Sequence, residues 1–523
     1  MKKNIFYLAV FCSSLLIINS CKKKLSDDYL NPESTTTASV DKLFTTMLTN
    51  PRIHPTYYDY ATFVTGVTAK YSQMIGIVTD RQMYVPSPSY SGSRWSDYYA
   101  GGIVNQYFEM LKNYNKIPES QQGDHYIFMQ LAKIIYYDQT AQIIDLWGDI
   151  PFSEAGSLDA SNTLVYPKYE DAASIYDTLI NGLKDLNNYL SSATLSSAAQ
   201  NSLKLQDILL NGDLNAWRLY VNSLRLRLLM RISNVNETFA KTEITAMLND
   251  PATFPVVDDN SKNILLRMKP STFISDIHNG LADGASSSGP YAPSYLLDTV
   301  MVGNNDPRTD VFWDKGSANS NYQGLSPFTS SSDQSTEIQQ GKISTFDSAT
   351  FMYNYNVPGV LFTAAETSFL RAEAYERWGL GDAQTEYENG IKQSIAFYYS
   401  INQSSVLSSG SWNSLATPNS ASIMAYISGS NIAYSGTQDQ KLSKIATQKW
   451  INFFVLQAGQ AWAEMRRTKY PKLNFAEDAA YPTAMLPPSR LLYPEEESVY
   501  NTANYNAVKS KDTRDTKIFW DVK

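Results

Sequence analysis

Apolar side chains recur at the spacing of an α-helix over most of this sequence, whereas the alternation typical of strands is sparse. The segments that carry the helical pattern are 38–50, 92–115, 125–147, 169–190, 213–233, 238–249, 360–378, 382–400 and 440–468. A helix with one apolar stripe needs a partner against which to bury that stripe. The sequence therefore predicts a mostly α fold with little strand.

Residues 213–233 give a clear example of this pattern. Asp213 follows a glycine and is a natural N-cap, and Trp217, Val221 and Leu224 then fall on one helical face. We expect a helix that presents Trp217 to a packed core.

The segments 360–378 and 382–400 are expected to form a helical hairpin, because Gly379 favours a helix end and Asp382 favours the start of the next helix. Tetratricopeptide-like scaffolds stack antiparallel pairs of this sort. No clean sequence repeat accompanies the pairing. Long loops are expected at 74–92, 250–290, 314–350 and 401–421, and loops of this length often carry function.

The N-terminus has the pattern of a secretory signal, since two lysines precede an apolar run at 5–18. Directly after it, Ile18-Asn19-Ser20-Cys21 resembles a bacterial lipobox, which predicts Cys21 as the lipid attachment point. The alternative is an ordinary secreted protein in which Cys21 is incidental. The expected organisation is a signal peptide at 1–20, a lipid-anchored tether at 21–37 and a helical binding domain at 38–523.

Cysteine content and charge narrow the class of protein further. The only cysteines are Cys12, inside the expected leader, and Cys21, so the mature chain can form no internal disulfide. A large packed core has to hold it together, and 43% hydrophobic residues in a chain of 523 supply enough material. The formal net charge of −8 argues against a nucleic-acid partner. After the leader, no apolar run approaches the ~20 residues that a membrane-spanning helix needs.

Signals for catalysis are weak. The three histidines, His54, His125 and His278, are scattered without zinc-site spacing, and no phosphate loop or dinucleotide fingerprint occurs, so neither metal nor cofactor is expected. A glycoside hydrolase would need two carboxylates near one sugar bond. The best pair, Glu366 and Glu373, is separated by ~10.5 Å of helical rise, which exceeds the usual spacing. We expect buried or interface roles for both and no enzymatic activity, with a hydrolase as an alternative.

Aromatic residues are the positive signal for binding, because 36 Tyr and 9 Trp outnumber 21 Phe. Such rings can lie flat against a sugar while their O–H or N–H groups bond to hydroxyls or water. Most of these rings are expected in the core. The candidates for ligand contact are Arg81, Tyr84, Tyr90, Trp95 and Tyr98, followed by Tyr291, Tyr295 and Tyr322.

The segment 80–95 contains two prolines and a glycine, so we expect no regular helix there. Tyr84, Tyr90 and Trp95 are then expected on one exposed face near Arg81. The alternative is that Trp95 packs inward against the fold. In that case the site would lie among the three later tyrosines.

Several segments, in order, resemble the SusD/RagB-like nutrient-binding lipoproteins. The run 146–155, LWGDIPFSEA, is similar to the WGDIPYSEA turn of that family, and Asp213 and Trp217 with 222–227, NSLRLR, resemble its GD…W…NSLRLR helix. Further segments in the expected order are 306–308, 366–374, 448–450, 466–468, 487–497 and the final Trp520-Asp521. The resemblance extends from about residue 25 to the C-terminus.

This resemblance implies a SusD-like fold, with tetratricopeptide-like helix pairs and long irregular loops. It also implies a lipid-anchored protein of the outer membrane and cell surface, which binds an oligosaccharide or related nutrient without catalysis. The implied partner is a SusC-like TonB-dependent transporter. Peptide cargo on the same fold and a helical scaffold that binds only protein are alternatives.

The motif residues themselves are expected to be structural. Arg466 and Arg467 with Glu464, and Arg225 with a carboxylate elsewhere, are interpreted as paired charges that fix helix contacts. The Trp-Gly-Asp sequence at 147–149 is interpreted as a packed turn in which Gly148 permits an unusual backbone angle.

Overall fold

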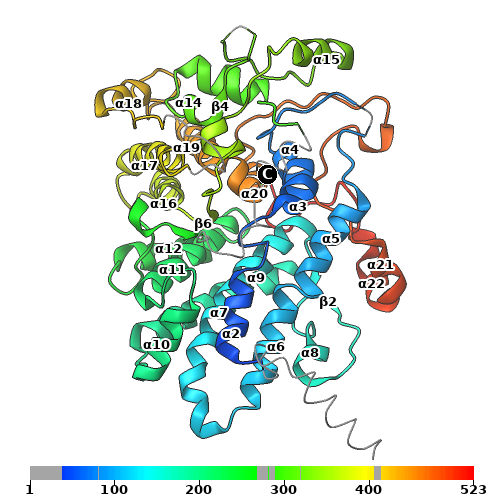
Figure 1. Cartoon of the computed structure of the whole chain (residues 1–523), viewed down its shortest axis with the longest axis vertical. Coiled ribbons are helices and arrows are strands. Elements are labelled where there is room, and N and C mark those ends of the chain that lie inside the picture. The colour runs from blue at the N-terminus through cyan, green and yellow to red at the C-terminus, as the bar shows by residue number, and fades with distance from the viewer. Residues whose placement is uncertain (1–37, 81, 268–280, 282–288, 319, 406–413) are drawn as a thin grey trace, which may run out of the picture.

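The computed structural model of the chain describes residues 38–80, 82–267, 281, 289–318, 320–405 and 414–523 (Figure 1). The expected signal peptide, Cys21, the tether to residue 37 and Arg81 lie outside the described residues. Helices dominate the described part, so the predicted mostly α fold is confirmed.

The α-helices of the first half are α2 (Val40–Leu48), α3 (Tyr57–Asp59), α4 (Ala69–Tyr71), α5 (Pro88–Tyr99), α6 (Ile103–Asn115), α7 (Glu119–Trp147), α8 (Ser157–Ser161), α9 (Ala172–Ser192), α10 (Ser197–Gln206), α11 (Leu214–Arg231) and α12 (Glu237–Asn249). Those of the second half are α14 (Thr309–Phe312), α15 (Ser331–Gln339), α16 (Ala364–Trp378), α17 (Ala383–Gln403), α18 (Ser420–Ile427), α19 (Gln438–Phe453), α20 (Ala458–Thr468), α21 (Glu495–Tyr500) and α22 (Thr502–Val508).

Wider π-helical turns form η1 (Tyr60–Thr68), η3 (Tyr295–Met301) and η5 (Ser348–Met352). Short 3₁₀ turns form η2 (Asn260–Lys262), η4 (Val302–Asn304), η6 (Val455–Gln457), η7 (Pro482–Ala484) and η8 (Lys509–Lys511). The strands make three antiparallel pairs, namely β1 (Ile150–Pro151) with β2 (Tyr169–Glu170), β3 (Ile264–Leu266) with β6 (Gly359–Phe362), and β4 (Trp313–Asp314) with β5 (Thr345–Phe346).

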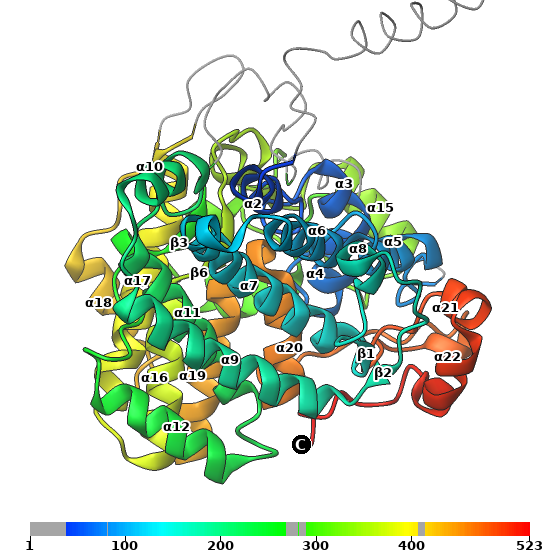
Figure 2. The same ribbon diagram turned by 90° about the horizontal axis from the view of Figure 1, so that it is seen from below.

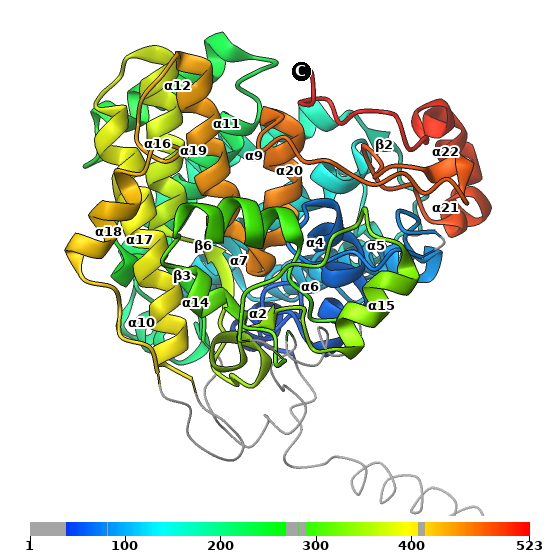
Figure 3. The same cartoon turned by 90° about the horizontal axis from the view of Figure 1, so that it is seen from above.

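Helices that follow one another along the chain pack as pairs, notably α6 with α7, α16 with α17 and α19 with α20, while α9 pairs with α11 (Figure 2). The predicted hairpin is confirmed at α16 and α17. Gly379 ends α16 with a left-handed φ of 68°, and the Asp382 carboxylate accepts the N–H of Thr385 at the start of α17. Figure 3 shows α16 and α17 on one side of α19 and α20, with α4 and α5 on the other.

The structure of α11 confirms both parts of its prediction. The Asp213 carboxylate accepts the N–H groups of Asn215 and Ala216, which satisfies the first turn. Trp217 is fully buried, and its indole N–H donates to Asp207 at 2.7 Å.

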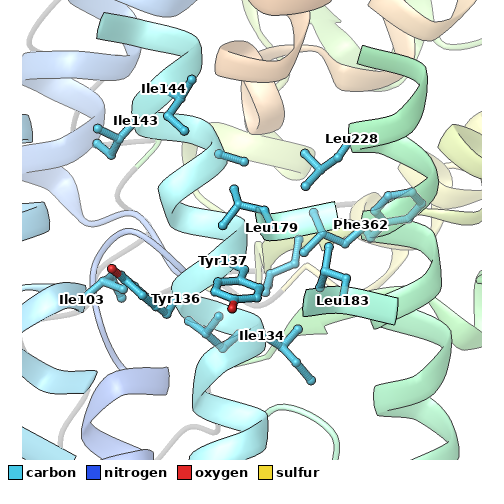
Figure 4. Packing of buried hydrophobic residues seen from close by; sticks show 14 of the residues in the cluster. Ile103, Ile134, Tyr136, Tyr137, Ile143, Ile144, Leu179, Leu183, Leu228 and Phe362 are labelled. Carbon is cyan, nitrogen blue, oxygen red and sulfur yellow. The ribbon is translucent and has the colours of Figure 1, made fainter. Parts of the chain in front are cut away.

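Two apolar clusters make up the interior. The first is built mainly by α2, α6, α7, α9 and α11, together with residues 491–520 from the C-terminal end (Figure 4). The second is built by η3, α14 and α17–α19. Helices α16 and α20 contribute side chains to both clusters, so they lie between the two cores.

Buried charges join the helices at this boundary. Arg467 contacts Glu373 at 2.6 Å and Glu464 at 2.7 Å, and Lys449 contacts Glu464 at 2.5 Å. Burial alone would raise the pKa of Glu373, but Arg467 and Lys449 lower it to about 2. The predicted pairing of Arg467 with Glu464 is confirmed. The charges cross-link α16, α19 and α20.

Other motif charges are also structural. Arg225 forms an ion pair with Glu243, as expected. Arg466 instead donates to the carbonyls of Asp145 and Ser489, both at 2.8 Å, and lies over the Trp462 ring. It has no carboxylate within ion-pair distance among the described residues, so its expected pairing with Glu464 is wrong.

Backbone geometry confirms one expectation and corrects three boundaries. Gly148 has φ 81°, as expected for the turn that ends α7. The predicted helix 92–115 is two helices, because Gly101 has φ 74° and breaks it. The predicted helix 440–468 is broken at Phe454, with φ 40°. A helix also starts at Pro88, where none was expected, because proline is tolerated at the first helical position.

Candidate functional site

Trp95 belongs to the fold and not to the surface. Its side chain is 4% exposed, and its ring packs within 4.9–6.5 Å of four other rings. We call this group the aromatic nest, and it consists of Trp95, Tyr99, Trp147, Tyr169 and Tyr493. The prediction that Trp95 faces outward is therefore wrong, and the alternative that it packs inward is confirmed.

The polar atoms of the aromatic nest all bond to protein. The Trp95 indole N–H donates to Glu497 at 3.0 Å, and the Tyr169 hydroxyl donates to the same carboxylate at 2.7 Å. Tyr99 donates to the carbonyl of Pro151 at 2.8 Å. The polar atoms of Trp95, Tyr99 and Tyr169 therefore already have hydrogen-bond partners in the described part of the protein.

Tyr84 and Tyr98 are also interior residues. Both are fully buried, so the expected exposure of Tyr84 is wrong. The Tyr84 hydroxyl donates to the carbonyl of Ala476 at 2.7 Å, and the Tyr98 hydroxyl lies 2.7 Å from that of Thr140. Each hydroxyl finds its partner in a distant segment, which the sequence near Tyr84 and Tyr98 does not reveal.

Tyr90 is the predicted ring of this segment that reaches the surface. It is 40% exposed, and its ring lies 6.4 Å from that of Tyr58, which is 46% exposed.

Of the later tyrosines, Tyr322 is half-buried and donates to Asp310 at 2.5 Å. Tyr291 is half-buried, and its carbonyl accepts the N–H of Gly76.

Tyr295 lies in a groove, because it lines two neighbouring cavities. The smaller, of about 220 Å³, is formed by Gln73, Ile75, Ile77, Pro293, Ser294, Tyr295, Asp298, Thr299, Leu325, Pro327, Phe328 and Asn474. The larger, of about 770 Å³, also includes Tyr295 and Thr299. Tyr295 therefore stands between two openings, and we call the two cavities together the Tyr295 groove.

The small cavity combines apolar and polar lining residues. Phe328 is 65% exposed at its rim, and Ile75, Ile77 and Leu325 form the apolar floor. Gln73 and Asn474 lie on the polar side, where the Gln73 amide donates to the Asn474 carbonyl at 2.6 Å. A mostly apolar wall with a few placed polar groups is the usual composition of a small-molecule site.

Backbone hydrogen bonds hold the walls in place. Leu325 N–H donates to the Ala292 carbonyl at 2.7 Å, and Ser294 N–H donates back to the Leu325 carbonyl at 3.1 Å. Gly76 N–H donates to Tyr291 at 2.7 Å, and a Cβ at Gly76 would lie 3.1 Å from that carbonyl. Because the three segments approach so closely, Tyr295 projects from a fixed frame.

The buried amide of Gln334, on α15, clamps the outer wall. Its nitrogen donates to the carbonyls of Ile77 and Ser326, and its oxygen accepts the Thr79 N–H at 2.6 Å. These bonds join the segment before α5 to the loop that carries Phe328. These hydrogen bonds therefore hold in place the loop that carries the exposed Phe328 ring.

The large cavity is lined mainly by small polar side chains from the turn at 430–436 and from α19. Its charged groups are partly satisfied by protein. The Lys444 ammonium donates to the Ala433 carbonyl at 2.6 Å, and burial lowers the pKa of Lys444. The Tyr470 hydroxyl donates to Asp439 at 2.6 Å, and this bond raises the pKa of Tyr470. Such a surface suits a neutral polar ligand.

The two carboxylates that a glycoside hydrolase would have used, Glu366 and Glu373, both form buried ion pairs with arginine. Glu366 is fully buried and accepts two bonds from Arg227, at 2.6 and 2.7 Å, while Glu373 belongs to the buried charge cluster. Their expected structural roles are confirmed. Within the described ranges, no three His, Cys, Asp or Glu side chains gather as a metal site. No helix in that part of the chain is long and apolar enough to cross a membrane.

Sequence reasoning missed most of the Tyr295 groove. Phe328 is the best missed signal, because it is a lone ring in a loop of serine, threonine and proline. Gln73 and Asn474 carry no such signal, since 401 positions separate them and only the fold brings them together.

Comparisons with known proteins agree with this architecture. The model of the SusD-like family described as "Starch-binding associating with outer membrane" matches residues 32–494. A search of curated proteins finds no match. A Bacteroidetes SusD-like structure has a TM-score of 0.74 at 21% identity, over 93% of this chain and 100% of that one. A chitin-binding SusD homologue from Flavobacterium johnsoniae has a TM-score of 0.71 at 22% identity, over 92% and 99%. These likenesses confirm the predicted fold.

Proposed function

The chain belongs to the SusD-like family of proteins described as starch-binding and associated with the outer membrane, and from this premise we propose that it captures an oligosaccharide in the Tyr295 groove. The observation that carries the proposal is the pairing of two accessible rings, Tyr295 and Phe328, with a large cavity in which most of the polar lining side chains are uncharged. Stacking would hold the sugar faces, and the polar side chains would bond to hydroxyls.

The first ligand class to test is an N-acetylated glucosamine oligosaccharide, because two proteins of the same fold are described as chitin-binding. The groove favours a neutral ligand of this kind. Asp439 is bonded to Tyr470, Lys444 to two backbone carbonyls and Asp298 to the N–H of Gly324. Lys472 is then the charged lining residue that has neither a hydrogen bond nor an ion pair within the described residues. Peptides are the competing ligand class, and they are titrated in the same experiment.

We also propose that the protein binds its ligand without chemical change and passes it to a SusC-like TonB-dependent transporter. The absence of catalysis is argued from Glu366 and Glu373, whose carboxylates are buried and paired with arginine.

Anchoring to the outer membrane would come from acylation at Cys21. A Cys21→Ser chain should fold and leave the membrane fraction. Its recovery with the outer membrane in cells that lack the transporter would contradict the anchor.

Calorimetry with the soluble Cys21→Ser chain tests the ligand class. Chito-, malto- and xylo-oligosaccharides and a set of peptides of similar length are titrated in turn. We expect saturable binding of at least one glycan series and none of the peptides. Binding of peptides alone would show that the ligand is a peptide and not a glycan.

Product analysis after long incubation should show intact glycan. Release of reducing ends that disappears in Glu366→Gln would contradict the binding-only role.

A further inference from the structure

The Tyr295 groove adjoins a further cavity, of about 200 Å³. This cavity shares Asp439 and Tyr470 with the large cavity of the groove. It shares no lining residue with the small cavity, which adjoins the large one at Tyr295 and Thr299. The three cavities therefore follow one another, and the large cavity has Tyr295 at one border and Tyr470 at the other.

One segment of the chain lines both parts of the groove. It consists of residues 470–474, which follow α20, and we call it the wall segment. Its first residues, Tyr470, Pro471 and Lys472, line the large cavity, and Asn474 lines the small one. The two cavities of the groove therefore share this wall.

Hydrogen bonds hold the wall segment at both ends. The Tyr470 N–H donates to the Thr468 hydroxyl at 3.1 Å, and the Tyr470 hydroxyl donates to Asp439 on α19 at 2.6 Å. At the other end, the Asn474 carbonyl accepts the Gln73 amide at 2.6 Å. A side chain that is already held loses little freedom when a ligand binds, so the Tyr470 ring is preorganised.

Tyr470 and Lys472 place an aromatic ring beside a free hydrogen-bond donor. Tyr470 is half-buried, and the Lys472 ammonium lies 5.8 Å from the centre of its ring. Lys472 is exposed, and within the described residues it has neither a hydrogen bond nor an ion pair. A tyrosine ring can pack against the C–H face of a sugar, and an ammonium group has three protons to donate. The pair therefore offers a neutral sugar both a stacking surface and a donor for its hydroxyl or amide oxygens.

We propose that Tyr470 and Lys472 form a second sugar-binding position, so that the protein selects long oligosaccharides over short ones. This inference rests on the proposed function of the Tyr295 groove. A short chain fills only the space near Tyr295 and Phe328, whereas a longer chain crosses the large cavity, of about 770 Å³, and contacts both tyrosines. Two contacts within one ligand raise its affinity above that of either contact alone.

Calorimetry across a series of chain lengths tests the second position. Chito-oligosaccharides from the disaccharide to the hexasaccharide are titrated into the soluble Cys21→Ser chain, and the affinity should rise with length. In Tyr470→Ala, the hexasaccharide should lose about 10-fold in affinity while the disaccharide changes by less than about 2-fold. No loss for the hexasaccharide, or an equal loss at every length, overturns the proposal.

Two further variants control for folding and for the chemistry of the ring. Lys472→Ala changes an exposed side chain, so it should weaken hexasaccharide binding by about 3-fold at an unchanged thermal midpoint. If Tyr470→Ala does not fold, Lys472→Ala decides the question, and wild-type affinity for the hexasaccharide then overturns the proposal. Tyr505→Ala is the matched control, because Tyr505 also donates to an aspartate, Asp512 at 3.0 Å, but lines none of the three cavities. It should keep the full dependence on length.

The same titrations separate a failure of the second position from a failure of the proposed function. Malto- and xylo-oligosaccharides of the same lengths replace the chito-oligosaccharides if that series does not bind. Binding whose affinity does not rise with length contradicts the second position alone. If no glycan of any length binds, the proposed function is contradicted, and the second position with it.

Discussion

The aromatic nest and the Tyr295 groove are both rich in rings, yet they differ in where their polar atoms are satisfied. In the nest, Trp95 and Tyr169 donate to one carboxylate, that of Glu497. Trp95, Trp147 and Tyr493 are buried there, and Tyr99 and Tyr169 are partly buried. In the groove, the Tyr295 hydroxyl has no hydrogen-bond partner within the described residues, and Phe328 is mostly exposed. A tryptophan or tyrosine ring can be buried where the fold supplies a partner for its polar atom. The number of aromatic residues in the sequence does not show where the fold does this.

The largest expected effect is on stability, at Trp95. Trp95→Ala should lower the free energy of unfolding by ~3–5 kcal/mol, because it empties the centre of the nest and leaves Glu497 with one donor fewer. Denaturant titration measures it. Trp95→Phe is the control, since it keeps a six-membered ring but loses the indole N–H and the volume of the second ring, so it should cost less than Trp95→Ala. A stable Trp95→Ala chain with weakened glycan binding would return Trp95 to the site.

The next effect is on affinity, at Tyr295. Tyr295→Ala should weaken glycan binding by about 30-fold, or ~2 kcal/mol, because a ring at the centre of a site loses its stacking contact. The unfolding midpoint should fall less than in Trp95→Ala, since the Tyr295 ring is only half-buried where it packs against the second core. Tyr295→Phe separates stacking from hydrogen bonding. If calorimetry gives wild-type affinity for Tyr295→Ala, the ligand lies outside the groove.

Phe328 should contribute less, because it stands at the rim and solvent competes for its contacts. Phe328→Ala is expected to reduce affinity about 5-fold, near ~1 kcal/mol, without loss of stability. Leu158→Ala, at another exposed apolar position (54% exposed), is the control and should leave affinity unchanged. Equal losses in both variants would indicate a general effect of surface hydrophobicity.

Tyr90 should show the smallest effect. Its ring is exposed beside Tyr58 and lies in neither the nest nor the groove cavities. Tyr90→Ala should change both the affinity and the free energy of unfolding by less than ~0.5 kcal/mol. A clear loss of affinity would mean that the ligand extends beyond the groove toward α5.

Local signals predicted the scaffold better than the site. The cap at Asp213, the Gly379 turn and the charge pair of Glu464 with Arg467 all depend on neighbours within a few positions, and each was predicted. The position of Trp95 was not, because its partner Glu497 lies 402 positions away. Tyr295 was named as a candidate, but the groove around it joins segments that only the tertiary fold brings together.

The first core is completed by the last residues of the chain. The indole N–H of the buried Trp520 donates to Asp145 on α7 at 2.9 Å, and Leu491 N–H donates to the carbonyl of Leu146 at 2.8 Å. A nascent chain that carries only the N-terminal helices therefore has an open interface where these residues belong. Loss of Trp520 would therefore take one hydrogen-bond donor from Asp145 and a buried ring from the first core.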